Sequence, residues 1–526
     1  MKKITLLLIF LLTILNSFSQ VEIVTDFSWA FAKKVNNRIV FSHNTADYGK
    51  ELWVSDGTTE GTVLLKDINP GTGDSTPFHF TLLDDVVYFQ ANTHQIWRTD
   101  GTIGGTYLMV NNNQITNPYG FVKTKNFIFF TEGASGSGCC RTLWKMNVNA
   151  NSESIVTPLE NFTTVRDLNV FNYSSDDILF NAQTSSNGWA IWRSNGGVSL
   201  LVKDLYTEYS DGVQMGIAKK FGDDLYFSGF TPALGAELWK TDGTLSNTNL
   251  VKDIYSDNTL WEKSSGVNNF IKVGATIYFT AKDIIHGYEL WKTDGSEAGT
   301  QLIKDIYPGN NNNSPPSNLT EFNNQLYFVQ SDGVSRQVWK TDGTEVGTIK
   351  VSNIPNGYFE GNSTAMFAFN NVLYFSYYHP DFGVELWKLD ANDNLTIIQD
   401  INIGTGGSSP FEIFEYNGYI YFSAYTNNTY GSLKTFRIID QSLTAENFNK
   451  SDTISIYPNP TSDFINIKME KYSYFNTEIY NVLGKKVGNY KNQKSIDISH
   501  LTSGIYQVKI MDLKTNTFSS YKIIKN

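Results

Sequence analysis

The sequence predicts an all-β protein in which one four-stranded unit repeats along most of the chain and a smaller β-domain follows. Three observations support this prediction. Tryptophan recurs in the same context at spacings of 44 to 52 residues between Trp53 and Trp387. An apolar-aromatic-Phe strand precedes most of these tryptophans, and two-residue turns rich in Asn, Asp and Gly separate the strands. Four short strands every 40 to 50 residues is the period of a β-propeller blade.

The tryptophans define the repeated units. Phe436 occupies the same slot 49 residues after the last of them, which gives nine units in all. Because blades pack face to face, we expect the large aromatic side chains to fill the space between neighbouring blades. The predicted blade-packing residues are Trp53, Trp97, Trp144, Trp192, Trp239, Trp291, Trp339 and Trp387.

The seventh unit shows the expected strands most clearly. They span residues 318–322, 325–330, 336–340 and 348–351, with turns at Asn323-Asn324 and Asp342-Gly343. The ninth unit ends after its third strand, near residue 439, whereas residues 23–27 resemble a fourth strand without a unit of their own. We therefore predict that the N-terminal strand completes the last blade and closes a ring of about nine blades; two smaller rings are the alternative.

Composition excludes several classes of protein. The chain has 526 residues, of which 14% are aromatic and 18% charged, a balance that argues against intrinsic disorder. Its 41 Lys and Arg against 52 Asp and Glu leave a net charge of −11, so no nucleic-acid partner is expected. Two cysteines, the adjacent Cys139 and Cys140, cannot form a disulfide framework, and their redox state stays open.

The two ends of the chain have compositions of their own. Residues 1–19 combine two lysines, an apolar run and a small-residue cleavage site, which predicts a signal peptide; a membrane anchor is the alternative. The propeller repeats are then expected at 20–440 and a polar linker at 441–452. Residues 453–526 contain short alternating strands typical of a small C-terminal β-sandwich, with an ordinary adhesive domain as the alternative reading.

Two resemblances follow from these motifs. The phrase Glu-Leu-Trp-x-x-Asp-Gly-Thr, complete at 51–58 and 237–244, resembles the ELWxxDGT repeat proteins of secreted bacterial chains, over about 21–440. The third and fourth units depart from it. The ordered set at 457–460, 482–485 and 501–506, with a basic end, resembles the type A C-terminal sorting domain of the Bacteroidetes type IX secretion system. This second resemblance implies contact with the secretion machinery and its sorting protease, removal of the tail, and release or surface attachment.

The residues that recur at the same position in several units are expected to be structural. An Asp-Gly turn lets the carboxylate accept backbone N–H bonds while Gly takes a positive φ. A carboxylate two residues before the tryptophan could hydrogen-bond between blades. The first group comprises Asp56, Asp100, Asp242, Asp294 and Asp342, and the second comprises Glu51, Glu237, Glu289 and Glu385.

Candidate binding residues lie elsewhere, on the face formed by the fourth-strand exit loops. Loop variation on a rigid scaffold commonly carries binding, and exposed aromatics could stack on sugars or anchor a protein. We predict ligand contacts at Trp261, Tyr358, Tyr377 and Tyr378. Asp67 and Asp74 with loop carbonyls could supply oxygen ligands for Ca²⁺, although no calcium-loop motif occurs.

No catalytic or metal-binding motif stands out, and the six histidines never occur at zinc spacing. We therefore expect a monomeric binding or adhesion protein, secreted or attached to the outer-membrane surface, that recognises an extracellular polysaccharide or protein and needs no cofactor. A propeller-type glycoside hydrolase or polysaccharide lyase, and a purely structural surface component, are the alternatives.

Overall fold

The computed structural model describes residues 21–29, 31–133, 142–148, 157–159, 162–170, 175–184, 188–205, 213–256, 264–310, 313–351, 357–359, 366–426, 433–439, 454–458, 461–469, 475–481, 486–512 and 518–526. Throughout these ranges the regular secondary structure is β-strand, without a helix. The predicted signal peptide and linker lie outside them. The chain divides into a repeat unit, Glu22–Ile438, and a second unit that includes Ile439–Asn526.

The described part of the repeat unit contains nine four-stranded sheets, eight of them built from consecutive strands. Their strands are β2 (Lys33–Val35), β3 (Arg38–Thr45), β4 (Gly49–Ser55) and β5 (Val63–Lys66) in sheet 1; β6 (Phe78–Leu83), β7 (Val86–Ala91), β8 (Gln95–Thr99) and β9 (Tyr107–Asn111) in sheet 2; β10 (Pro118–Lys123), β11 (Phe127–Glu132), β12 (Leu143–Asn147) and β13 (Thr157–Leu159) in sheet 3; and β14 (Thr164–Val170), β15 (Ile178–Gln183), β16 (Ala190–Ser194) and β17 (Ser199–Lys203) in sheet 4.

The next four sheets repeat this order. They comprise β18 (Val213–Phe221), β19 (Asp224–Thr231), β20 (Gly235–Thr241) and β21 (Asn249–Lys252) in sheet 5; β22 (Asn268–Val273), β23 (Thr276–Asp283), β24 (Gly287–Thr293) and β25 (Gln301–Leu302) in sheet 6; β26 (Ser317–Phe322), β27 (Gln325–Ser331), β28 (Arg336–Thr341) and β29 (Ile349–Lys350) in sheet 7; and β30 (Phe367–Phe369), β31 (Val372–His379), β32 (Gly383–Asp390) and β33 (Leu395–Gln399) in sheet 8.

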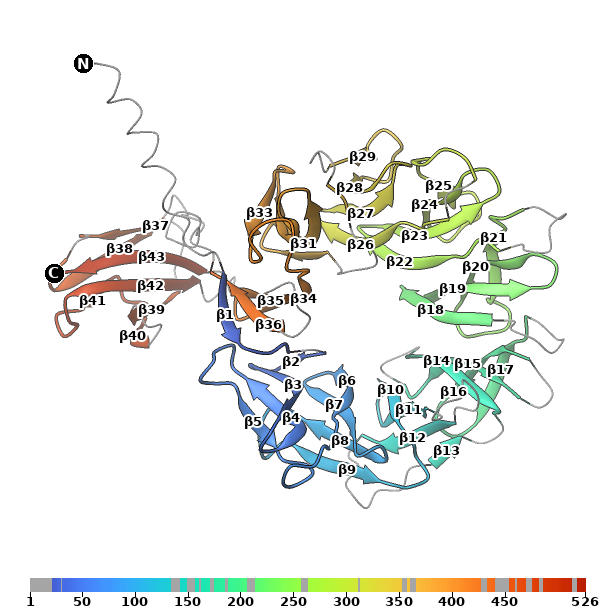
Figure 1. Ribbon diagram of the computed structural model, residues 1–526, viewed down its shortest axis with the longest axis horizontal. Helices are drawn as coiled ribbons and strands as arrows, with labels where there is room; N and C mark the ends of the chain where they lie inside the picture. The colour runs from blue at the N-terminus through green and yellow to red at the C-terminus, as the bar shows by residue number, and fades with distance from the viewer. Residues whose placement is uncertain are drawn as a thin grey trace. The chain divides into compact units, whose positions relative to one another are not determined.

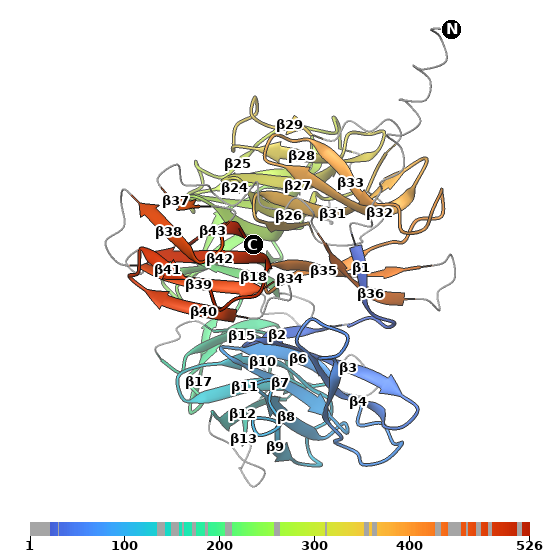
Figure 2. The same ribbon diagram turned by 90° about the vertical axis from the view of Figure 1, so that its left-hand side faces the viewer.

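Sheet 9 joins the two ends of the repeat unit. It contains β34 (Phe411–Tyr416), β35 (Tyr419–Tyr425), β36 (Leu433–Ile438) and, beside β36, the first strand of the chain, β1 (Val21–Thr25). Figures 1 and 2 both show the blue β1 next to the orange β36. The N-terminal strand thus occupies the fourth-strand position of the last sheet.

The sheets follow one another in chain order with their first strands toward a common centre (Figure 1). Each first strand from β2 to β30 contacts the first strand of the next sheet. The hairpins after several first strands are tight because Asn and Asp tolerate a positive φ, as at Asn36 (50°), Asp84 (53°) and Asn323 (52°). The arrangement is propeller-like.

Hydrophobic clusters fill the spaces between successive sheets. Each in-register tryptophan packs in the cluster that its own sheet shares with the preceding one: Trp53, Trp97, Trp144, Trp192, Trp239, Trp291, Trp339 and Trp387. Trp97, for example, packs with Val87 of its own sheet and with Val40 and Leu52 of sheet 1. One indole in each of sheets 1 to 8 therefore packs between two sheets.

Sheets 9 and 1 also pack against each other. Trp29 is 1% exposed and stacks on Phe41 of sheet 1 and Tyr421 of sheet 9, with ring centroids 5.5 and 5.7 Å away. The Tyr421 hydroxyl donates to the Gly57 carbonyl at 3.1 Å, and Lys34 Nζ lies 2.9 Å from Glu415 Oε2. The first and last sheets are thus neighbours through core and polar contacts alike.

The C-terminal unit consists of two sheets. Sheet 10 contains β37 (Ile454–Tyr457), β38 (Phe464–Met469) and β41 (Ser495–Asp497), and sheet 11 contains β40 (Lys486–Lys491), β39 (Phe475–Asn481), β42 (Gly504–Asp512) and β43 (Phe518–Lys525). Ile465 and Ile496 of sheet 10 and Ile479 and Val508 of sheet 11 share one core and are fully buried. Two antiparallel sheets around a common core form a small β-sandwich. Among the described residues, no helix is long and apolar enough to cross a membrane.

Candidate functional site

The Asp-Gly turns after the third strands have one repeated geometry. In each, the Asp carboxylate accepts from the backbone N–H and the hydroxyl of the residue two positions on, as from Thr344 at 2.9 and 2.7 Å in the Asp342 turn. These bonds hold the pKa of the Asp342 carboxyl below its usual range. Equivalent bonds to the residue two positions on form at Asp56, Asp100, Asp242 and Asp294.

Glycine is required in these turns for two reasons. Gly343 has a φ of 90°, a conformation that residues with a Cβ rarely adopt. A methyl group there would also lie 2.8 Å from the hydroxyl of Tyr278, which comes from the preceding sheet. The turn is therefore part of the contact between neighbouring sheets.

The glutamates before the tryptophans bind the loops that lead from one sheet to the next. Glu51 is fully buried on β4 and accepts from the backbone N–H of Ile68 at 2.8 Å and from the Ser75 hydroxyl at 2.6 Å. Glu385 on β32 accepts from the Ser408 hydroxyl at 2.5 Å and from the Asn402 N–H at 3.3 Å. These carboxylates hold the inter-sheet connections against the third strands.

Two of these glutamates have strongly raised pKa values. Burial raises the pKa of Glu237 and of Glu385 from 4.5 to about 7, and the nearby carboxylates Asp253 and Asp400 add to the shift. A folded-state pKa above the unfolded value means that folding favours the protonated group. Their stabilising contribution is therefore complete below pH 4.5 and is lost as the pH rises through about 7.

This shift gives a pH prediction. Between pH 5 and pH 8, the melting temperature of the double variant Glu237→Gln/Glu385→Gln should fall less than that of the natural chain. Calorimetry measures both. Sheet 7 already carries an amide in this slot, where Gln337 donates to the Gly357 carbonyl at 2.6 Å. The exposed pair Glu297→Gln/Glu345→Gln removes the same charge and is the control. Equal pH dependence in all three proteins would contradict the assignment.

The predicted aromatic residues on the exit-loop face have different environments. The rings of Tyr358 and Tyr378 are stacked with centroids 4.5 Å apart, and their backbones are hydrogen-bonded to each other. Both side chains are partly exposed, so this pair is a candidate contact surface. Trp261 lies outside the described residues.

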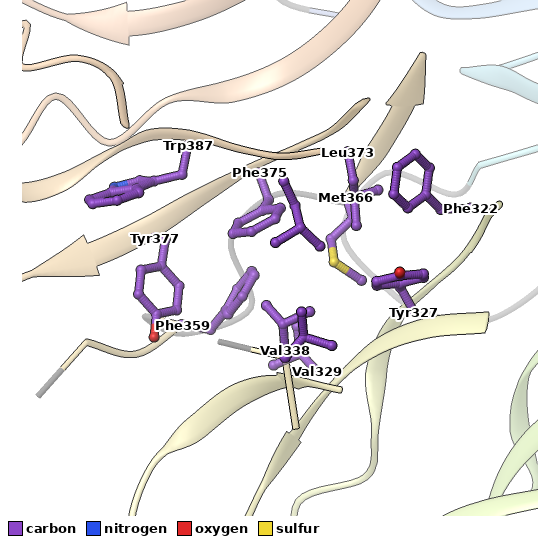
Figure 3. Close-up of a cluster of buried hydrophobic side chains, with 12 residues drawn as sticks. Phe322, Tyr327, Val329, Val338, Phe359, Met366, Leu373, Phe375, Tyr377 and Trp387 are labelled. Carbon is purple, nitrogen blue, oxygen red and sulfur yellow. The ribbon is translucent and has the colours of Figure 1, made fainter. Parts of the chain in front are cut away.

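The prediction for Tyr377 is wrong, because its side chain belongs to the core. Tyr377 is 0% exposed, and its hydroxyl donates to Gln337 Oε1 at 2.8 Å. Figure 3 shows its ring in the cluster with Phe359 and Trp387, between sheets 7 and 8. A ligand could reach it only if this cluster opened.

A hollow of about 730 Å³ lies on the opposite face, where the first strands of sheets 2 to 5 end. This volume is within the range of ordinary ligand sites, about 300–1,000 Å³. Because first and third strands end at the same edge, the hollow shares its face with the Asp-Gly turns. Its lining includes Leu82 of β6, Val122 of β10, Val170 of β14 and Ala218 of β18. The sequence prediction placed binding on the other face and missed this site.

The proposed calcium ligands have partners within the chain. Asp74 Oδ1 accepts from the Lys50 N–H at 2.7 Å, and Asp67 Oδ2 accepts from the Gly71 N–H at 3.4 Å. In the part of the chain that the structure describes, no three His, Cys, Asp or Glu side chains gather as a metal site would require. Calcium binding there stays a prediction.

Comparison with known proteins identifies the C-terminal unit. Residues 455–526 match the family model described as a secretion system C-terminal sorting domain. This segment is a sorting domain. The protein is therefore secreted or held at the cell surface, and its tail interacts with the type IX secretion machinery. No curated protein matches the chain.

Solved structures resemble the chain only distantly. A computationally designed protein, Ika8, has 11% identity and a TM-score of 0.36, covering 77% of this chain and 95% of its own. PorZ, a surface component of the type-IX secretion system of Porphyromonas gingivalis, has 9% identity and a TM-score of 0.26, covering 94% and 81%. BamB from Moraxella catarrhalis has 11% identity and a TM-score of 0.39, covering 68% and 95%.

Proposed function

We propose that this chain is an extracellular binding protein whose residues 20–440 form a closed nine-bladed β-propeller that recognises a polysaccharide or protein outside the cell. A signal peptide at 1–19 starts export, and a sorting protease removes the tail after outer-membrane passage. Ring closure is supported by β1, which lies beside β36, and by Trp29, which packs between sheets 9 and 1.

The observation that carries the binding proposal is the hollow at the ends of β6, β10, β14 and β18. Four sheets contribute to it, so a ligand would contact residues that a rigid ring holds in place. Sites formed on rigid elements hold a ligand with little loss of conformational entropy. The exported location of the protein makes an extracellular ligand the natural occupant.

The test uses the chain from residue 20 to 526. We expect it to be retained on at least one class of immobilised extracellular glycan or on a surface protein fraction, without degrading the glycan. Release of reducing sugars or of unsaturated products would instead favour a glycoside hydrolase or a lyase. The absence of both retention and turnover would overturn the binding proposal and favour a structural surface component.

A further inference from the structure

The hollow between sheets 2 and 5 has an unusual charge for this acidic chain. Four lysines line it, Lys123 and Lys125 from sheet 3 and Lys219 and Lys220 from sheet 5, with Asp84 as the single carboxylate. Four positive charges and one negative charge leave +3, in a chain whose net charge is −11. Clustered like charges repel one another unless an anion lies between them.

Two carboxylates lie close to lysines of the hollow and compensate part of this charge. Asp84 is paired with Lys123, at 2.5 Å between Oδ2 and Nζ. Asp176, close to Lys125, accepts from the backbone and side-chain amides of Asn126, both at 2.7 Å. Lys125 from sheet 3 and Lys219 from sheet 5 both line the hollow and are exposed. An anionic group between them could accept hydrogen bonds from both ammonium groups.

The repeat shows that the register position of two of these lysines takes both lysine and apolar residues. In the strand register, Lys123 lies opposite Ile128 and Lys220 lies opposite Leu225. Ile128 and Leu225 are each the first residue of the apolar-aromatic-Phe strand of their sheet. In sheet 2 the residue in this register is Leu82, and in sheet 4 it is Val170. Apolar side chains therefore occupy the same position in sheets 2 and 4, whereas Lys123 in sheet 3 pairs with Asp84 of sheet 2.

Part of the lining between the lysines is apolar. Leu82 is 43% exposed, and Leu168, Val170 and Ala218 also face the hollow. A sugar ring presents C–H groups that pack on such a surface, while a carboxylate or sulfate on the ring would reach the ammonium groups at the rim. A polymer that carries such groups at intervals could extend across the exposed opening.

We propose that the lysine-lined hollow binds an acidic polysaccharide, with a carboxylate- or sulfate-bearing sugar unit between Lys125 and Lys219. This inference rests on the proposed function and names the ligand class for it. The lysines supply charge-assisted hydrogen bonds, and the apolar wall between them supports the ring.

The test measures affinity for polygalacturonate and for heparin, with uncharged dextran as the neutral probe. The full chain from residue 20 should bind the two polyanions and not dextran, more weakly as salt rises. Lys125→Ala/Lys219→Ala should lose about tenfold in affinity per lysine, because each change removes one charge-assisted hydrogen bond. Lys468→Ala/Lys491→Ala removes the same charge from exposed positions of the C-terminal unit and should bind normally.

The outcomes separate this inference from the function on which it rests. Equal affinity in the two double variants, with unchanged melting temperatures, would overturn the assignment of the hollow. Retention on dextran, on neutral glycans or on a protein, without polyanion binding, would overturn the acidic ligand and leave the proposed function standing. Failure to bind any glycan or protein would overturn both.

Discussion

A chain that ends at residue 450 is expected to accumulate in the periplasm, whereas the full-length chain reaches the medium or the cell surface. The truncation removes residues 455–526, which match the sorting domain, and leaves the repeat unit and the predicted signal peptide in place. Because the machinery selects its cargo by this domain, its loss should abolish outer-membrane passage. The measurement is quantitative immunoblotting of periplasm, cell surface and medium.

The control separates loss of the signal from misfolding. The truncated protein, purified from the periplasm, should show the same protease-resistant core as the repeat unit of the full chain, because the two units have separate contacts. A second variant, Ile496→Asp, places a charge at a fully buried position of the sandwich and should cause the same retention. Truncated protein in the medium at full-length amounts would refute the role of the tail.

Trp29→Ala is expected to lower the free energy of unfolding by about 3–5 kcal/mol, the usual cost of removing a buried indole. Trp29 stacks on rings of sheets 1 and 9, so its loss opens a cavity where the ends of the repeat unit meet. The measurement is chemical denaturation of the chain from residue 20, followed by tryptophan fluorescence and circular dichroism.

Trp189→Ala is the matched control, because Trp189 also lies outside the tryptophan register. It is 4% exposed in the cluster between sheets 4 and 5, which are joined directly by the chain. If sheets 9 and 1 pack as firmly as the others, the two variants should lose similar stability. The prediction would be wrong if Trp29→Ala lowered the free energy of unfolding by less than about 1 kcal/mol while Trp189→Ala lowered it by several. The two ends of the repeat unit would then have no firm contact.

The repeated strands and turns could be predicted because their causes are local. Asn323-Asn324 forms its hairpin through residues that accept positive φ, and the alternation of strand residues places Phe328 in the core. The tryptophan slots follow from the same register. These features depend on residues within one unit, and the sequence shows that unit nine times.

Tyr377 shows where the prediction of exposed aromatics failed. Neighbouring sheets cover both faces of each sheet. The alternation of polar and apolar residues along a strand therefore does not distinguish buried from exposed side chains. A signal was nevertheless present: Tyr377 stands two residues after Phe375, on the same side of the strand. Both side chains are fully buried in one cluster, whereas Tyr378 points the other way and is partly exposed.

The hollow could not be predicted from any single unit. It brings together Leu82, Lys123 and Lys220, which lie far apart in the chain and meet only because successive first strands converge. Most first strands are also bulged, as at the register shift between Phe78 and Thr81, which changes the direction of their side chains. The sequence shows lysine at the same repeat position in two units, as Lys123 and Lys220. It does not show that these two side chains line one hollow.

The proposed closure of the repeat unit into one ring is tested by a direct count of the sheets. The measurement is electron microscopy of the chain from residue 20, with class averages viewed along the ring axis. The account predicts one ring of nine blades, with β1 beside β36 in the last of them. Averages that show two smaller rings, or an open arc with a gap between its ends, would contradict it.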